Sequence, residues 1–295
     1  MSEVDFKSEK IMTLTIDIEP ASAAAGARIH GIDLHEELDD RTIDMIRNAF
    51  TEYCVLCFPA QKIAPDDQLR FANLFGRGDG SFRDRSSGDL KRSGSRGVML
   101  VSNIRKNGQP IGSLPDGEMQ FHTDGAHREY PYRATTLYAI RIPSRGGNTL
   151  FANLYTAYDT LSDAMKARIE DLETVCVYDY AATERSTIGD DPDLPRATHR
   201  LVKTHPDSGR KSLYVCRLMT EYIVGMSRDE SEKLLVGLID HAENPEFVYA
   251  HEWTPGDLLI WDNRCLNHAR TDFPAEEQRL LRRYTVSEPN APVAN

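Results

Sequence analysis

His122 and Asp124 stand two residues apart, after the apolar approach Met119–Phe121 and before Gly125. This pattern predicts an extended strand, and side chains at positions i and i+2 of a strand point to the same face. One imidazole nitrogen and one carboxylate oxygen can then bind the same metal ion. With one further histidine from a distant part of the chain, the set becomes the two-histidine, one-carboxylate facial triad that binds non-haem Fe(II).

Spacing alone does not identify the metal pair, because five of the nine histidines have an acid two residues later. His205/Asp207 lies in a Pro-Asp-Ser-Gly turn, where aspartate commonly bonds its own backbone. His241/Glu243 lies at a predicted helix end, where the two side chains point apart. His35/Glu37 belongs to an acidic run, and turn signals flank His127/Glu129. His122/Asp124 is therefore the favoured pair, and a core histidine beside a turn-forming aspartate is the alternative.

A second histidine and several arginines follow near the C-terminus. The predicted strand and turn Trp261–Asn267 leads to His268, and Arg279, Arg282 and Arg283 come later. Arg279 and Arg283 are four residues apart, so on an extended strand they share one face and Arg282 takes the other. Two guanidinium groups in one pocket suit two anions, through bidentate pairing. The alternative is a solvated charge run that pairs with neighbouring glutamates.

Composition describes a globular protein with enough chain for a sizeable core: 295 residues, 40% hydrophobic and 27% charged. The formal net charge of −11 argues against nucleic-acid and anionic-membrane surfaces. No apolar run approaches the ~20 residues of a membrane span. The acidic N-terminus lacks signal-peptide features, so we expect a cytoplasmic location. The five scattered cysteines, including the Cys54–Cys57 pair, favour buried free thiols over disulfides.

The elements that must position these residues are mostly short strands. Apolar and alternating runs predict strands at 12–18, 27–34, 54–58, 98–101, 119–124, 135–142, 149–152, 200–204, 212–217, 247–253, 257–261 and 280–286. Capping residues predict helices at about 40–53, 65–75, 156–158, 164–172 and 228–241. Polar segments at 78–97 and 181–198 predict long loops. Without repeats or linkers, the chain reads as one β-rich domain over 1–295, a sandwich or barrel with helical additions.

Together these motifs resemble the TauD/TfdA family of Fe(II)- and 2-oxoglutarate-dependent dioxygenases, whose named members act on taurine and on 2,4-dichlorophenoxyacetate. The resemblance covers nearly the whole chain, from about residue 27 to residue 286. It is carried by Phe121–Asp124, Gly146–Thr149, Ala157–Tyr158, Thr204–Pro206, Ser208–Val215, Trp261–Arg264, His268 and the arginines that follow.

The resemblance implies a β-rich α+β fold, with a double-stranded β-helix (jelly-roll) core and flanking helices. It assigns Fe(II) to His122, Asp124 and His268, 2-oxoglutarate to Thr149 and Arg279, and the anionic group of the substrate to Arg283. It also implies that O2 and 2-oxoglutarate are cosubstrates, and that hydroxylation releases succinate and CO2. Related halogenases lack the carboxylate ligand, so Asp124 favours hydroxylation or desaturation.

The segment after Asp124 differs from both named members and is where we expect substrate choice to reside. His127, Arg128 and Tyr130 are its candidate pocket residues. We expect a small, anionic substrate such as a sulfonate, a carboxylate or an aryloxyalkanoate. Two alternatives are a non-catalytic jelly-roll ligand-binding relative and a Zn-dependent hydrolase with the same triad. The sequence leaves open whether the chain forms a homo-oligomer.

Overall fold

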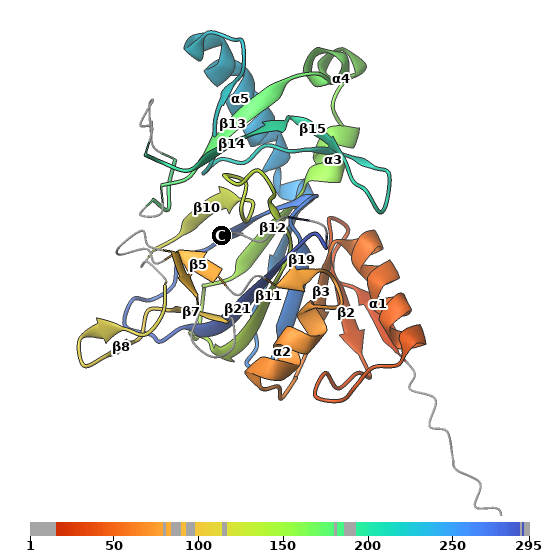
Figure 1. Ribbon diagram of the computed structural model, residues 1–295, viewed down its shortest axis with the longest axis vertical. Coiled ribbons are helices and arrows are strands. Elements are labelled where there is room, and N and C mark those ends of the chain that lie inside the picture. The colour runs from red at the N-terminus through yellow and green to blue at the C-terminus, as the bar shows by residue number, and fades with distance from the viewer. Residues whose placement is uncertain are drawn as a thin grey trace, which may run out of the picture.

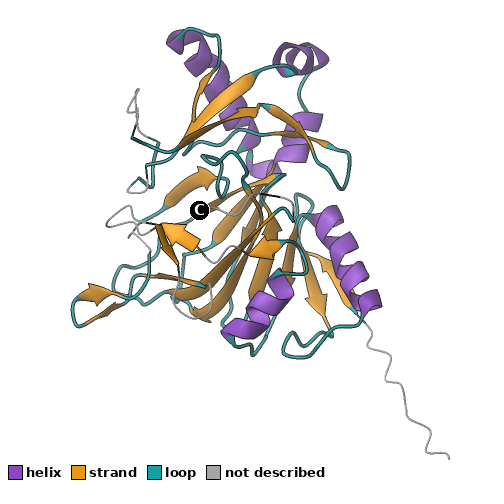
Figure 2. Cartoon of the chain, in the orientation of Figure 1, coloured by secondary structure: helices purple, strands orange, loops and turns teal. Residues whose placement is uncertain are grey.

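Two β-sheets form the centre of the protein, with helices outside them (Figures 1 and 2). The computed structural model describes residues 16–78, 81–83, 90–92, 98–113, 117–179, 182–185, 193–289 and 291. The larger sheet has the order β1 (Asp17–Pro20), β2 (Ala27–His30), β3 (Val55–Phe58), β19 (Leu258–Asp262), β11 (Tyr132–Arg141), β21 (Leu280–Ser287) and β4 (Arg77–Gly78), and β7 (Met99–Ser102) also pairs with β21. The predicted β-rich α+β class is confirmed.

The smaller sheet carries the candidate site. Its order is β10 (Met119–His122), β20 (Leu266–Arg270), β12 (Thr149–Asn153) and β18 (Val248–His251). The other strands form a three-stranded sheet, β14 (Arg196–Arg200), β13 (Glu173–Val177) and β17 (Thr220–Ile223), and three hairpins: β15 (Val202–Thr204) with β16 (Lys211–Leu213), β5 (Ser81–Arg83) with β6 (Leu90–Arg92), and β8 (Arg105–Lys106) with β9 (Gln109–Pro110).

The helices cover the sheets from two sides. Helices α1 (Asp40–Tyr53) and α2 (Pro65–Ala72) pack on the larger sheet, while α3 (Leu154–Asp159), α4 (Asp163–Ile169) and α5 (Arg228–Ala242) gather with β13–β17 at the other end of the molecule (Figure 1), and a short 3-10 helix spans Pro245–Phe247. Asp39 and Ser227 accept backbone N–H bonds as the N-caps of α1 and α5, as the sequence predicts. None of the helices among the described residues has the length and apolar character needed to span a membrane.

Strand register brings the chemically important residues into two rows on one face of the smaller sheet. Phe151 pairs with both Tyr249 and His268, and His268 pairs with His122. Two residues away, Thr149 pairs with both His251 and Arg270. Directly paired residues share a face, and so do residues i and i+2. Phe151 and Tyr249 belong to the core cluster that also contains Trp261 of the larger sheet, so this face points between the two sheets.

Most predicted elements are present, and the following predictions about strands and loops need correction. The strand expected at 12–18 runs from Asp17 to Pro20, and residues up to 15 lie outside the described residues. The loop expected at 78–97 contains β5 and β6, which pair with each other. The loop expected at 181–198 ends earlier, because β14 begins at Arg196. The strands in these two segments are too short to show an alternating polar and apolar pattern. They form because a partner strand lies beside them.

All five cysteines are buried and free, as the sequence predicts. Cys54 is not part of the strand expected at 54–58, because it ends α1 in the left-handed conformation, with φ of 64°. Cys57 lies in β3. The Cys54–Cys57 motif is thus a helix end followed by a buried strand.

Candidate metal centre and anion sites

His122 and His268 are directly paired across β10 and β20, and their ring centroids are 4.1 Å apart. Asp124 extends its carboxylate toward both rings. Its Oδ1 atom is 4.0 Å from His122 Nε2, and its Oδ2 atom is 3.8 Å from His268 Nε2. The expectation that both residues of the His-x-Asp pair lie on a strand is wrong, because β10 ends at His122. A turn brings the carboxylate back, and Gly125 permits it with φ of 78°.

The donor set and its protonation fit a divalent metal ion. His122 Nδ1 donates to the carbonyl oxygen of Gln120 at 2.9 Å, which leaves Nε2 as the ring nitrogen on the Asp124 side. Burial and the neighbouring His122 ring hold the pKa of His268 well below its usual value, so this ring is neutral. Burial alone would raise the pKa of Asp124, but the adjacent positive charge of Arg283 lowers it below its usual range. Two imidazole rings and one carboxylate are the donor set of the non-haem Fe(II) facial triad.

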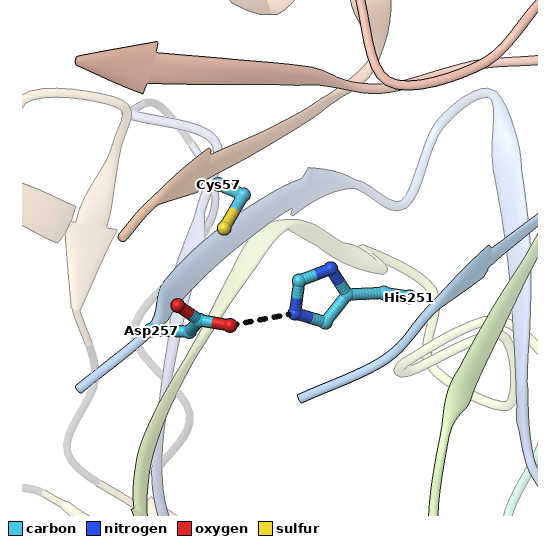
Figure 3. A group of neighbouring side chains, drawn as sticks. All are labelled: Cys57, His251 and Asp257. Carbon is cyan, nitrogen blue, oxygen red and sulfur yellow. Dashed lines mark hydrogen bonds and ion pairs between the residues drawn. The ribbon is translucent and has the colours of Figure 1, made fainter. Parts of the chain in front are cut away.

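Two other buried groups have metal-ligand residue types, and Figure 3 shows one of them, Cys57, His251 and Asp257. His251 Nε2 lies 3.2 Å from Asp257 Oδ2, and its Nδ1 bonds the Tyr249 hydroxyl at 2.9 Å. Burial raises the pKa of the Cys57 thiol to about 12, whereas a metal ligand must be a thiolate. The bonds to Asp257 and Tyr249 occupy both ring nitrogens of His251, so this group is a structural hydrogen-bond network and not a metal site.

The other group consists of His205, Asp262 and Cys265. Both ring nitrogens of its histidine are also occupied by hydrogen bonds. The backbone N–H groups of Asp207 and Ser208 donate to His205 Nδ1, both at 3.2 Å. The proton of the ring is therefore on Nε2, which lies 3.1 Å from Asp262 Oδ2. The sequence-based choice of a turn rather than a metal site for His205/Asp207 is consistent with this geometry.

Arg279 is a buried cation with no carboxylate partner among the described residues. Its side chain is 1% exposed, and its guanidinium donates to the carbonyl oxygen of Gly147 at 3.2 Å. Among the described residues no carboxylate pairs with it, and its Nε has no hydrogen-bond partner. Burial and the positive charge of Arg270 lower the pKa of Arg279 to about 9. A buried guanidinium in this state favours a bound anion, because an unpaired buried charge is costly.

Thr149 comes two residues after Gly147, whose carbonyl oxygen bonds Arg279, and its hydroxyl has a proton to donate. Its hydroxyl accepts a hydrogen bond from Trp253 Nε1 at 3.0 Å. Because an indole N–H only donates, the hydroxyl proton of Thr149 is left for an acceptor. Thr149 is paired with Arg270, and both Arg270 and Arg279 lie over the ring of Phe273. The sequence-based site omitted Arg270, although its position two residues after His268 on β20 was a usable signal.

Arg283 lies beside the triad and is more accessible than Arg279. One of its terminal nitrogens is 2.6 Å from Asp124 Oδ1, and its side chain is 25% exposed. Arg282 points the opposite way, toward Gln68 Oε1 at 2.7 Å and the carbonyl oxygen of Ile63 at 3.0 Å, as the strand period predicts. Arg279 itself precedes the first residue of β21, Leu280.

The three residues predicted from the segment after Asp124 have different surroundings. His127 stacks on Tyr178 with ring centroids 5.1 Å apart, and the Arg128 guanidinium lies 4.4 Å from the centroid of Tyr132. Tyr130 is 47% exposed. Tyr178 and Tyr132 both lie near Arg283, and no local pattern marks either of them, because their position depends on how distant strands pair.

Comparison with known proteins explains this constellation. The model of the taurine catabolism dioxygenase TauD, TfdA family matches residues 17–285. The chain belongs to this family. The (S)-phenoxypropionate/alpha-ketoglutarate-dioxygenase of Sphingobium herbicidovorans is 32% identical over 280 residues, which cover 92% of this chain and 94% of the relative.

Solved structures agree with the family assignment. A taurine dioxygenase from Burkholderia xenovorans superposes with a TM-score of 0.77 at 31% identity, covering 92% of this chain and 89% of the other. AAD-2 in complex with Mn(II) and N-oxalylglycine superposes with a TM-score of 0.76 at 32% identity, covering 95% of this chain and all of the other. The chain is a 2-oxoglutarate-dependent dioxygenase that uses Fe(II) and O2, which confirms the predicted reaction class over a hydrolase or a non-catalytic relative.

Proposed function

We propose that this dioxygenase binds Fe(II) through His122, Asp124 and His268 and hydroxylates a small organic anion. The observation that carries the proposal is that two arginines four residues apart differ in exposure, Arg283 beside Asp124 and Arg279 beside Gly147. Arg279, at 1% exposure, is the deep cation and pairs with no carboxylate of the described residues, and Arg283, with a side chain 25% exposed, is the outer one. Two cations at different depths suit two anions that bind one above the other, the cosubstrate first.

The deep site takes the far carboxylate of 2-oxoglutarate. Arg279 supplies the positive charge and Thr149 the hydroxyl proton, so one carboxylate can neutralise the first and accept from the second. N-oxalylglycine in the related AAD-2 structure is also a dicarboxylate. With 2-oxoglutarate and O2, bound Fe(II) supplies the oxidant for a substrate C–H bond. The contribution of these two side chains is to orient the cosubstrate and hold it at the metal.

The outer site takes the anionic group of the substrate. A guanidinium has five N–H donors, so Arg283 can bond Asp124 with one nitrogen and an incoming carboxylate, sulfonate or sulfate with the others. The stacked pair His127 and Tyr178, with Tyr132 nearby, offers apolar ring surface for the body of the substrate. An arylalkanoic acid combines both features, and (S)-phenoxypropionate, named for a relative, is one.

We infer further that the two facing sheets form a double-stranded β-helix and that residues 1–295 are one domain. The family match over 17–285 without interruption supports both. The cytoplasmic location stays a prediction from the sequence.

The substrate proposal is tested by succinate formation with Fe(II), ascorbate and 2-oxoglutarate over a panel of arylalkanoates, sulfonates, sulfate esters and phosphonates. Each acid is paired with its neutral methyl ester or amide as the matched control. We expect at least one anion to stimulate succinate release and its neutral analogue to fail. Equal stimulation by acid and ester would contradict anion recognition.

Arg283→Gln is expected to raise the KM for the stimulating anion about 10- to 100-fold, because a charge-assisted bidentate contact is lost. The apparent KM for 2-oxoglutarate should change less than about threefold, an estimate that reflects the separation of the two sites. Steady-state kinetics with each substrate varied in turn measures both values. An effect confined to 2-oxoglutarate would reverse the roles proposed for Arg283 and Arg279.

Gly147→Ala is expected to weaken 2-oxoglutarate binding about tenfold, because the side chain of Arg279 must move. A Cβ at residue 147 would lie 3.1 Å from Arg279 Nε and 3.3 Å from its Cδ. Gly209→Ala is the matched control, because the backbone φ is +70° at Gly209 and +66° at Gly147. A Cβ added at Gly209 would have no atom within 4 Å, so only the backbone strain is shared. Both variants should lose about 1 kcal/mol of stability. Titration of 2-oxoglutarate into the Mn(II) form decides, and equal affinities in the two variants would contradict the prediction.

A further inference from the structure

A chain of hydrogen bonds runs from the larger sheet to the metal-binding carboxylate. Trp261 Nε1 donates to Asn263 Oδ1 at 3.0 Å, and Asn263 Nδ2 donates to Thr135 Oγ1 at 3.0 Å. Thr135 Oγ1 donates in turn to Asp124 Oδ2 at 2.6 Å. Trp261, Asn263 and Thr135 are each at most 1% exposed, so water does not compete for these bonds.

The direction of this chain is fixed at its far end. An indole N–H only donates, so it selects the amide orientation in which Asn263 Oδ1 accepts and Nδ2 faces Thr135. The Thr135 hydroxyl must then accept from the amide, and its own proton points to Asp124. The last bond joins a neutral hydroxyl to a carboxylate and is short and charge-assisted. A hydroxyl that could otherwise rotate is thereby held as a donor to one oxygen of the metal ligand.

The sequence stretch Trp261–Arg264 supplies this chain, and nothing in the proposed function requires its polar residues. Asp262 and Arg264 turn away from the triad, because Asp262 bonds His205 and Arg264 pairs with Asp262, Asp207 and Glu288. Asn263 alone of these three polar residues faces Thr135. At the end of β19, Asp262 and Arg264 thus form ion pairs away from the triad, and Asn263 is the residue connected to Asp124 through Thr135.

We propose that Thr135, oriented by Asn263, is a positioning residue that holds the Asp124 carboxylate in its metal-binding conformation. This inference rests on the proposed triad. Asp124 lies in a turn, not in a strand, so backbone pairing does not hold its side chain. Its two described hydrogen-bonding or ion-pairing partners, other than the two histidines, are Thr135 on Oδ2 and Arg283 on Oδ1. Thr135 is the buried one, and Arg283 is the one assigned to the substrate. Replacement of such hydrogen-bond partners of metal ligands typically weakens metal binding 10- to 100-fold.

The test is the affinity of the intact chain for Mn(II) alone, measured by calorimetry, so that turnover does not enter. Thr135→Val keeps the shape and removes the donor, and we expect it to weaken Mn(II) binding about 10- to 100-fold. Thr135→Ser restores the hydroxyl and should bind within about threefold of the unmodified protein. Asn263→Ala should weaken binding less, and should add nothing in the Thr135→Val background, because the two act through one contact.

Thr136→Val is the matched control. Thr136 is the next residue of β11, is 1% exposed, and bonds the carbonyl oxygen of Tyr284 and Gln68 Nε2 on the opposite face. We expect this variant to unfold at lower temperature and to bind Mn(II) normally. Normal binding by folded Thr135→Val, or equal losses in Thr135→Val and Thr136→Val, would overturn the inference. If Thr135→Val does not fold, Asn263→Ala decides: weaker binding supports the inference and unchanged binding overturns it. Failure of the unmodified chain to bind one Mn(II) would instead refute the proposed triad.

Discussion

His122→Ala is expected to abolish both metal binding and 2-oxoglutarate-dependent succinate formation. The variant removes one of three ligands from a site in which His122 and His268 face each other across paired strands. Replacing a hydrogen-bond partner of a metal ligand already weakens metal binding about 10- to 100-fold. Removal of the ligand itself should therefore lower the affinity for Mn(II) at least about 100-fold. Succinate formation should fall to background, since no residue of the described site replaces the missing nitrogen.

The measurement is the thermal midpoint with and without Mn(II), alongside calorimetry. A ligand that binds only the folded state raises the midpoint, so the unmodified protein should be stabilised by Mn(II) and His122→Ala should not. His251→Gln is the control, because His251 belongs to the competing buried group with Cys57 and Asp257. It should bind one Mn(II), whatever its stability. Retained binding in His122→Ala and lost binding in His251→Gln would move the metal centre to that other group.

The three residues of the proposed metal site could be singled out from the sequence because the strands that carry the two histidines have local signals. An apolar approach and a following glycine mark the end of β10, and β20 follows a recognisable strand and turn. The conformation of Asp124 could not be predicted in the same way. Its carboxylate is directed by a turn and by contacts with Thr135 and Arg283, which are 11 and 159 residues away in the chain.

Residues whose role depends on sheet register were the ones that sequence reasoning missed. Asn263 and Thr135 are 128 residues apart and meet only because β11 and β19 are neighbours. Tyr178 follows β13, outside both main sheets, yet interacts with Arg283 of β21. None of Asn263, Thr135 and Tyr178 has a local sequence pattern that distinguishes it from an ordinary structural residue. Strand period predicts which face a side chain takes, but the partner on that face depends on pairings between distant segments.

Arg279→Met is expected to remove most of the affinity for 2-oxoglutarate. The lost contact is a charge-assisted bond in a buried site, for which we expect about 2–4 kcal/mol, or about 30- to 1,000-fold in affinity. Binding of 2-oxoglutarate to the Mn(II) form measures this directly. Pyruvate, which lacks the far carboxylate, should bind the variant and the unmodified protein alike. A similar loss for both compounds would show that Arg279 does not contact that carboxylate.

The same variant is expected to stabilise the protein when no cosubstrate is present. Arg279 is 1% exposed, has no described carboxylate partner, and carries a charge that burial and Arg270 disfavour. Methionine fills similar space without this cost, and apolar replacement of a poorly compensated buried charge is often stabilising. We expect a gain of about 1 kcal/mol, of the size that substitutions at strained functional sites commonly give. Arg282→Met should instead destabilise, because the bonds of Arg282 to Gln68 and Ile63 are satisfied.

Adding 2-oxoglutarate to the Mn(II) form should reverse this order of stability. At 100 times the dissociation constant, a bound ligand stabilises the folded state by about 2.7 kcal/mol, which the unmodified protein gains and Arg279→Met does not. Urea unfolding of both proteins, with Mn(II) throughout and with or without 2-oxoglutarate, measures the crossing. Lower stability of Arg279→Met in both conditions would mean that Gly147 and Phe273 satisfy the guanidinium as a structural group. A crossing would mean that the fold carries Arg279 at a cost that only the dicarboxylate offsets.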